Sequence, residues 1–353
     1  MILEHRADVV RGALVRAAAV ASSVAWAATG LGPVAVAAET IEQPTLELAA
    51  VRDPQLGAQV AIANHYGYFK DEGLTVTVRW TQSGADIITF MASGQQNLAA
   101  GSTFGQVVMG AQGLPVKTIA ALADNAATQG LVLSPGVKLG SPREFEGRRL
   151  AQTQGTPPIL ILTKMAGIYG FDMSKITFVN MNPSEGVVAA SKGDVDGLLS
   201  WEPNLSRLVG MGGSLYATGT AVYATGAPQP QRLIYNNALL MASQSFIDGK
   251  PNTLKAILRA ILKADQLLAK DRPQALAALE QELRIDADAI RVMTQSNIYG
   301  LALTDEVALG MRQMSDWAFD MKRIQKPVKP EDLMEPKFLG EIDPQLVRLQ
   351  SKR

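Results

Sequence analysis

The chain of 353 residues is long enough for about two domains, and its 47% hydrophobic and 19% charged residues allow each domain a packed core. Its formal net charge is zero, whereas nucleic-acid-binding proteins usually carry a surplus of Lys and Arg, so we expect no nucleic-acid partner. The sequence contains no cysteine, which excludes disulfides, thiolate catalysis and cysteine metal sites.

The first expected element is an export signal over residues 1–37. Arginines precede a run of small apolar residues that ends in Ala35-Val36-Ala37, which a signal peptidase could recognise. A membrane anchor helix is the alternative, but glycines and a proline at 30–33 interrupt the apolar run before the ~20 residues that a spanning helix needs. We therefore expect a cleavable signal peptide, a periplasmic location and no membrane span in the mature chain.

After the signal, short β-rich runs alternate with helical ones. The expected strands lie at 45–51, 74–80, 96–102, 117–123, 148–155, 176–181 and 195–200. The helices between them are expected at 55–73, 84–94, 103–112, 157–169 and 184–192. Strands separated by helices indicate βαβ units and a mostly parallel sheet. From Pro251 onward the sequence is largely helical, and a proline-rich extended segment covers 325–336.

Two stretches about a hundred residues apart share one pattern. Residues 83–102 and 183–200 each have a polar start, a helix of small and branched residues, a glycine with polar neighbours, a short strand and a final serine. Any βαβ chain can produce such a match by chance. The more specific interpretation is two similar lobes, each presenting the same kind of strand end and helix start.

Three stretches, at 63–78, 83–102 and 191–205, resemble the nitrate/sulfonate/taurine class of periplasmic binding proteins of ABC transporters. This class also includes the binding proteins for thiamine pyrimidine precursors. The first stretch contains the common opening "GYF-x-x-EGL", and Trp201-Glu202-Pro203 stands where the family often has Trp-Asp-Pro. Order and spacing match over roughly residues 45 to 340.

The resemblance implies a type II periplasmic binding protein fold, with two α/β lobes, a hinge and a ligand cleft between the lobes. Lobe one would comprise 43–130 plus 232–353, and lobe two 131–231, with hinge crossings near Leu133 and Arg232. The partners that it implies are a small-molecule ligand and the permease subunits of an ABC transporter. Such proteins normally work as monomers, and we expect no cofactor.

Ligands of open α/β sheets bind beyond the carboxyl ends of the strands, where helices begin and their N–H groups favour anions. The residues that follow the expected strands are therefore the candidate ligand-binding residues: Arg52, Gln55, Ser83, Gly84, Ser102, Thr103, Gln154, Gly155, Thr156, Ser184, Trp201 and Glu202. Small hydroxyl residues and glycines let backbone N–H groups approach an oxyanion closely.

Each candidate also has a purely structural interpretation. The three serines are ordinary helix N-caps as well, and Gly155 could simply form a tight turn. Trp201 could be packed in the core. Glu202 could receive an ammonium or hydroxyl group of a ligand, or it could pair with Arg207. Arg52 could bind a sulfonate, carboxylate or phosphate, or form a salt bridge with its acidic neighbour.

Catalysis has little support in the sequence. Beyond residue 37 the only histidine is His65, and motifs of serine hydrolases, zinc peptidases and phosphate loops are absent. We expect a binding protein without a metal that captures a small, anionic organic solute, sulfonate- or taurine-like, and delivers it to a permease. The alternatives are a binder of nitrate, an aromatic carboxylate or a pyrimidine precursor, or a ligand sensor or enzyme on the same fold.

Overall fold

The computed structural model describes residues 40–154, 156–224 and 226–350. The predicted signal peptide, residues 1–37, lies outside this part of the chain. Within the described residues, none of the helices combines the length and the apolar character that crossing a bilayer requires.

The first sheet has the strand order β14-β13-β4-β12-β3-β1-β2. Strands β1, β2 and β3 run parallel to one another, and β12 pairs antiparallel with β3 and β4. The strands of this sheet are β1 Thr45–Val51, β2 Thr75–Thr81, β3 Leu98–Ser102, β4 Val116–Asp124, β12 Asn237–Ser243, β13 Ile298–Thr304 and β14 Val347–Arg348.

The second sheet has the order β11-β10-β9-β5-β8-β6-β7. Its five strands β7-β6-β8-β5-β9 repeat the arrangement β2-β1-β3-β12-β4 of the first sheet. In the first sheet the antiparallel strand β12 lies between β3 and β4. In the second sheet the antiparallel strand β5 lies between β8 and β9 in the same way. The strands are β5 Gln129–Leu133, β6 Arg149–Gln152, β7 Thr177–Asn180, β8 Gly197–Trp201, β9 Ser214–Thr218, β10 Ala221–Val222 and β11 Gln229–Pro230.

The repeat predicted from the sequence is confirmed by this topology. Helix α3 (Gly84–Ala92) leads into β3, and helix α6 (Pro183–Lys192) leads into β8, at matching positions of the two sheets. The two helices begin in the same manner, because a polar N-cap residue and an acidic residue three positions later form a capping box in each.

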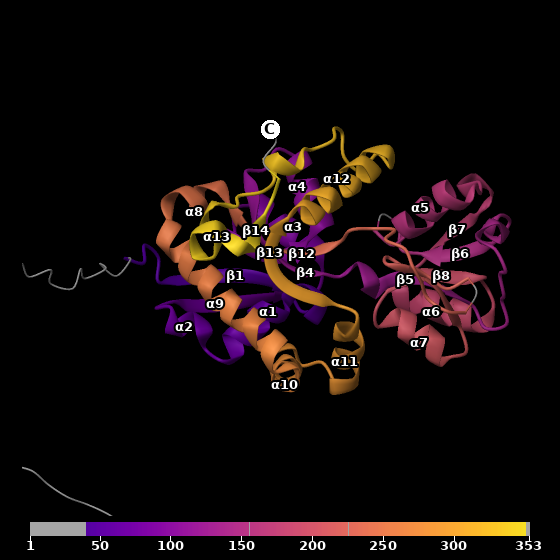
Figure 1. Cartoon of the computed structure of the whole chain (residues 1–353), viewed down its shortest axis with the longest axis horizontal. Coiled ribbons are helices and arrows are strands. Elements are labelled where there is room, and N and C mark those ends of the chain that lie inside the picture. Colours follow the sequence, from indigo (N-terminus) through magenta and orange to yellow (C-terminus); the bar gives the residue numbers. More distant parts are fainter. Residues whose placement is uncertain (1–39, 155, 225, 351–353) are drawn as a thin grey trace, which may run out of the picture. The chain divides into compact units, whose positions relative to one another are not determined.

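Helices cover both faces of the first sheet. Helices α1 (Pro54–His65) and α9 (Pro251–Lys270) lie on one face, and α3, α4 (Thr103–Ala111) and α12 (Asp305–Asp320) lie on the other (Figure 1). The strands β1, β3, β4 and β12 are accordingly buried along most of their length. The remaining helices of this part of the chain are α2 Tyr68–Asp71, α8 Gln244–Gly249, α10 Arg272–Leu283, α11 Ala287–Gln295 and α13 Lys337–Ile342.

In the second sheet, α5 (Ile159–Tyr169) covers one face and α6 and α7 (Asn204–Gly210) cover the other (Figure 1). The period-2 alternation of a strand explains the two cores. Leu131 and Leu133 of β5 belong to the cluster that includes the α5 residue Ile161. Val132, between them, packs in the cluster with Leu205 of α7.

Several expectations from the sequence differ from the structure. The sheets are mixed rather than mostly parallel, because β5, β12 and β13 pair antiparallel with their neighbours. Strand β13 lies in the stretch expected to be helical. The helix expected over 55–73 is two helices, because Gly67 has a left-handed φ of 71° that ends the helical path.

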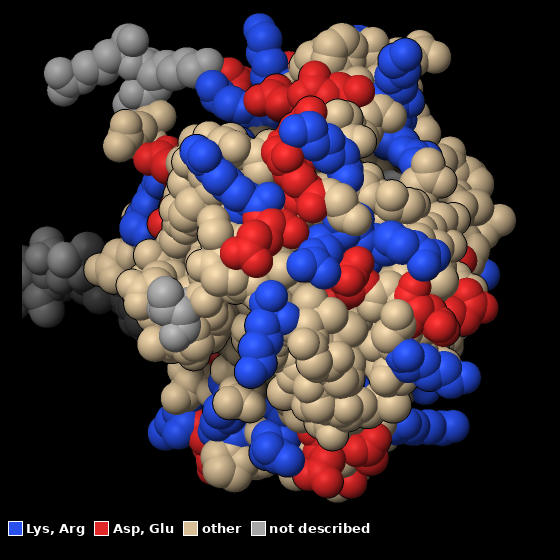
Figure 2. Space-filling model, turned by 90° about the vertical axis from the view of Figure 1, so that its right-hand side faces the viewer, with Lys and Arg blue, Asp and Glu red and all other residues tan. Residues whose placement is uncertain are grey.

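The chain passes between the two sheets twice. The first crossing lies between Asp124 and Gln129, through the 3-10 turn Ala126–Thr128, and the second lies between Pro230 and Asn237. The first crossing thus comes before Leu133, which is the last residue of β5. On the face displayed in Figure 2, basic and acidic side chains are interspersed, in keeping with the formal net charge of zero.

Candidate functional site

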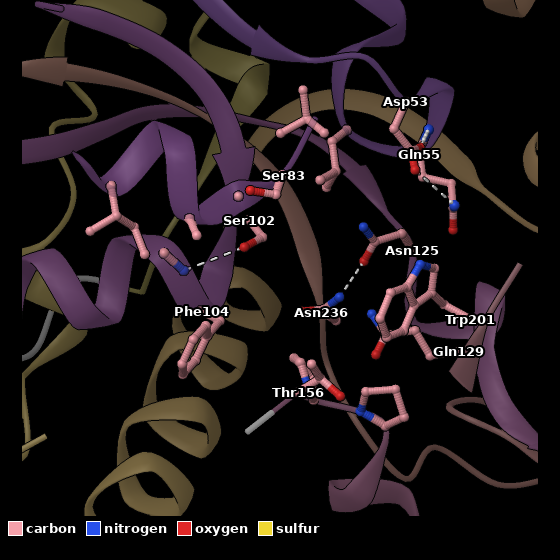
Figure 3. Close-up of a pocket in the computed structure, with 18 of the residues that line it drawn as sticks. Asp53, Gln55, Ser83, Ser102, Phe104, Asn125, Gln129, Thr156, Trp201 and Asn236 are labelled. Atoms are coloured by element: carbon pink, nitrogen blue, oxygen red, sulfur yellow. Dashed lines mark hydrogen bonds between the residues drawn. The ribbon is translucent and has the colours of Figure 1, made fainter. Parts of the chain in front are cut away.

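A cavity of about 390 Å³ lies where strands of both sheets end. Its wall is built from the first turns of α1, α3 and α4, from the segment that leads into α5, from the end of β8 and from both crossings (Figure 3). Strand ends and helix starts of two sheets therefore face one common space. This is the position at which open α/β folds bind ligands.

Two helix N-termini reach the cavity from the first sheet. Ser83 caps α3 and Ser102 caps α4, where its Oγ accepts a hydrogen bond from the Gly105 N–H at 3.3 Å. A Cβ at Gly84 would lie 3.9 Å from the Ser102 Oγ, so the two starts are neighbours. Gly84 and Gly105 line the cavity, and their lack of a side chain leaves the backbone open to it. The positive ends of both helices favour a negative group there.

The start of α1 presents a carboxylate. Asp53 is the N-cap of α1, and its carboxylate accepts hydrogen bonds from the Gln55 backbone N–H at 2.6 Å and from Gln55 Nε2 at 3.4 Å. Burial raises the pKa of Asp53 to about 6, against the opposing effect of these two hydrogen bonds. Asp53 lines the cavity and is mostly ionised at neutral pH.

The first turn of α1 is held from the far side by the segment that precedes and begins β13. The Tyr299 hydroxyl donates to the Pro54 carbonyl at 2.8 Å, and Asn297 Nδ2 donates to the Gln55 carbonyl at 3.3 Å. Burial raises the pKa of Tyr299, so its phenol stays protonated and remains a donor. These contacts fix the position of Asp53 and Gln55 at the cavity wall.

Gln55 also joins the two sheets. Its Nε2 donates to the backbone carbonyl of Glu202 at 3.1 Å, directly after the end of β8. Gln55 therefore links the carboxylate at the start of α1 to the chain that follows Trp201. The peptide bond between Glu202 and Pro203 is cis.

The two crossings supply amide side chains. Asn236 Nδ2 donates to Asn125 Oδ1 at 2.7 Å, and the Asn125 N–H donates to the Asn236 carbonyl at 2.9 Å (Figure 3). Two amide oxygens in the lining, Asn236 Oδ1 and Gln129 Oε1, are buried and accept no hydrogen bond within the described chain. Because buried polar atoms are normally paired, these two acceptors are available to a hydrogen-bond donor inside the cavity.

Much of the remaining wall is apolar. Trp201 at the end of β8, Phe104, Ile88 and the two prolines at 157 and 158 are part of this surface. Phe104 is held by an edge contact with the Trp317 ring, whose centroid lies 5.9 Å away. The cavity can therefore enclose a carbon skeleton as well as polar groups.

Half of the candidate residues predicted from the sequence line the cavity. These are Gln55, Ser83, Gly84, Ser102, Thr156 and Trp201. They share one property, since each lies at a strand end, just before a helix or in the first turn of a helix. Their role in binding remains a prediction.

Other candidates are engaged in the fold and are not among the lining residues. Arg52 lies against Trp80, with its guanidinium carbon 6.0 Å from the ring centroid. The Thr103 side chain is buried, and its hydroxyl bonds the backbone of Asn237. The Glu202 carboxylate accepts from the Ser206 N–H and hydroxyl, each at 3.0 Å, rather than pairing with an arginine.

Burial raises the pKa of Glu202, although its bonds to the first turn of α7 act against this effect. Ser184 is exposed and follows the actual N-cap of α6, which is Asn182. Gln154 is exposed, and its N–H donates to Asn180 Oδ1 at 2.8 Å. Gly155 lies outside the described residues.

The sequence analysis missed Asp53, Phe104, Asn125, Gln129 and Asn236. Asn125 directly follows β4, so the rule of strand ends would have identified it. Gln129 is the first residue of the antiparallel strand β5, and Asn236 directly precedes the antiparallel strand β12. The sequence analysis predicted neither strand. Asp53 was recognised only as a neighbour of Arg52.

The charged residues and the potential metal ligands of this site limit the kinds of ligand that it can bind. Among the described residues that line the cavity, Asp53 carries the only ionisable charge, and none is Lys or Arg. In the part of the chain that the structure describes, no group of three or more His, Cys, Asp or Glu side chains is arranged to hold a metal ion.

Comparisons with known proteins agree on the fold. The taurine-binding periplasmic protein of Escherichia coli (strain K12) is 23% identical over 209 residues, which are 59% of this chain and 62% of that relative. The crystal structure of the periplasmic aliphatic sulphonate binding protein from Escherichia coli has a TM-score of 0.70 at 14% identity, over 88% of this chain and 95% of that one. The periplasmic nitrate-binding protein from Synechocystis PCC 6803 has a TM-score of 0.63 at 15% identity, over 87% and 90%.

These similarities confirm the expected fold class, two α/β lobes of the periplasmic-binding-protein type. The sequence profile of the family described as "NMT1/THI5 like" matches residues 57–275, which is more than half of the chain. The matched region begins within α1 and includes the whole of the second sheet. The chain therefore belongs to the NMT1/THI5-like family.

Proposed function

We propose that this protein is an extracytoplasmic solute-binding protein that captures a small organic solute between its two lobes and delivers it to an ABC permease. The observation that carries the proposal is the cavity of about 390 Å³, in which two helix N-termini, an aromatic wall and unpaired amide oxygens converge. Such a volume suits a small molecule. The relatives that bind taurine, sulphonates and nitrate support an anionic group on the solute.

The two crossings, 125–128 and 231–236, are the proposed hinge. Their amide pair, Asn125 with Asn236, and the ion pair between Arg232 and Asp124 tie the crossings together beside the cavity. A solute that contacts the starts of α3 and α4 and also Trp201 would bridge residues of both sheets. It would stabilise the closed form through its higher affinity for that form.

Binding, rather than catalysis, is the activity that the site supports. The similar proteins described above are named as periplasmic binding proteins for taurine, aliphatic sulphonates and nitrate. The chain has no cysteine, so cysteine-dependent chemistry is not available to it. Export through the predicted signal peptide and action in the periplasm belong to the same proposal.

A thermal-shift screen of the chain from about residue 38 tests the proposal. The panel contains taurine, alkanesulfonates, nitrate, aromatic carboxylates and aminopyrimidines. A ligand at a hundredfold excess over its Kd adds about 2.7 kcal/mol to the free energy of unfolding, which is readily seen as a rise in Tm. A rise with one chemical class supports the proposal, and no rise with any member of the panel contradicts the proposed ligand class.

A further inference from the structure

We propose that Asp53, together with the free amide oxygens of Asn236 and Gln129, forms a subsite for a protonated amino group of the solute. The inference rests on the proposed solute-binding function and narrows its ligand class. The site would then prefer amine-bearing anions, whether sulfonates or carboxylates, over anions of the same size without an amine.

The first argument is the kind of atom left unpaired. Asn236 is 2% exposed, and its Nδ2 is used by Asn125, so Oδ1 is the end that remains free. Gln129 is 8% exposed and its Oε1 is also free. Both residues line the cavity with Asp53, whose carboxylate can only accept when ionised. All three groups thus require a donor, and an ammonium group supplies three N–H bonds.

The second argument is that these groups belong to one side of the cavity. Gln129 lies directly opposite Trp201 in the pairing of β5 with β8. The residue after Trp201 accepts a hydrogen bond from Gln55, whose backbone N–H donates to Asp53. Figure 3 shows Asp53, Asn236 and Gln129 around the same space as the Trp201 indole, a ring face that attracts a cation.

The third argument is charge balance. A solute with only a negative charge would face the Asp53 carboxylate, and no Lys or Arg among the described lining residues offsets that carboxylate. Inside a cavity such repulsion is screened far less than in water. A solute with both charges can place its anionic group at the starts of α3 and α4 and its ammonium group at Asp53, so each charge is matched.

The test is titration calorimetry with ligands that differ in one group. Taurine, 2-hydroxyethanesulfonate and ethanesulfonate share a two-carbon sulfonate, and β-alanine with propionate repeats the comparison for carboxylates. In wild-type protein we expect taurine to bind at least tenfold more tightly than ethanesulfonate, and β-alanine at least tenfold more tightly than propionate.

The matched variants are Asp53→Asn and Asp286→Asn. Each replaces an N-cap aspartate by asparagine, which still caps a helix, but Asp286 is exposed at the start of α11. Asp53→Asn should reduce the amine preference at least tenfold, and it should bind ethanesulfonate more tightly than the wild type does, because the repulsion by the carboxylate is removed. Asp286→Asn should keep the wild-type preference.

The possible failures are distinguishable. Equal affinity of the wild type for amine-bearing and amine-free members overturns the subsite and leaves the proposed function standing. An amine preference that persists in Asp53→Asn overturns the role of Asp53. If no sulfonate and no carboxylate of either kind binds, the proposed ligand class and the subsite both fall. The wild-type affinity ratio decides the question even if Asp53→Asn fails to fold.

Discussion

Replacing Asp53 by asparagine should make the ligand-free protein more stable at neutral pH. Burial raises the pKa of this carboxyl to about 6, from a usual value of 3.8. The folded protein therefore binds the Asp53 proton more tightly than the unfolded chain does, and ionisation of Asp53 costs folding free energy. Asparagine has no charge to desolvate and is as good an N-cap as aspartate.

The magnitude follows from the difference between the two pKa values. About 2 pH units at 1.36 kcal/mol per unit correspond to at most about 3 kcal/mol. Because the folded pKa is the higher one, the free energy of unfolding of the wild type should fall as the pH rises from about 4 to about 6, and this contribution is constant above that range. The gain from Asp53→Asn should thus be near zero at pH 4 and reach its maximum above pH 7.

The assay is urea unfolding, followed by tryptophan fluorescence at pH values from 4.5 to 8, with Asp286→Asn as the control. The difference between Asp53→Asn and wild type should grow with pH, whereas Asp286→Asn should follow the wild-type curve. Parallel curves for wild type and Asp53→Asn would refute the reasoning, as would a variant that is less stable than wild type at pH 8. A more stable variant that has lost its amine preference would show stability sacrificed for binding.

Two further predictions concern the link between the lobes and the packing beside the first crossing. Gln55→Ala removes the hydrogen bond from Gln55 to the Glu202 carbonyl and should weaken ligand binding by about tenfold, equivalent to about 1.4 kcal/mol. Titration calorimetry measures this affinity. An unchanged affinity would show that this bond is not part of the closed form. Gly219→Ala should lower the free energy of unfolding by more than about 2 kcal/mol, because its Cβ would lie 2.3 Å from the Ala126 carbonyl oxygen. The control Gly249→Ala should not lower it, because no atom lies within 4 Å of the added Cβ. Equal melting temperatures for the two variants would contradict the packing argument.

Much of the site could be predicted because helix starts are encoded locally. Ser83 and Ser102 each precede a helix and follow a strand within a few residues of sequence, so their place at a strand end can be inferred without knowing the rest of the fold. Trp201 follows from the same rule. These local patterns identified the starts of α3 and α4 and the end of β8 as parts of the cavity wall.

The remaining residues depend on contacts between distant parts of the chain. Asn236 reaches the cavity because β12 pairs with β3 and β4, more than a hundred residues earlier. The continuous apolar run of β12 does not by itself distinguish a strand from a buried helix. The sequence also could not show that Asp53, rather than its neighbour Arg52, faces the cavity, since that depends on how the chain turns after β1. The side chain that faces the cavity decides the charge of the site, which is negative with Asp53 and would be positive with Arg52.

The most direct test of the central claim is to fill the cavity and measure binding. Ala85 lines the cavity from the exposed first turn of α3, and Thr89 is exposed one turn later on the same helix without lining it. Titration calorimetry would compare wild type, Ala85→Trp and Thr89→Trp with the ligand that gives the largest thermal shift. We expect one site per chain in wild type and Thr89→Trp, and at least a hundredfold loss of affinity in Ala85→Trp at an unchanged melting temperature. Wild-type affinity in Ala85→Trp would show that the solute binds elsewhere and would contradict the account.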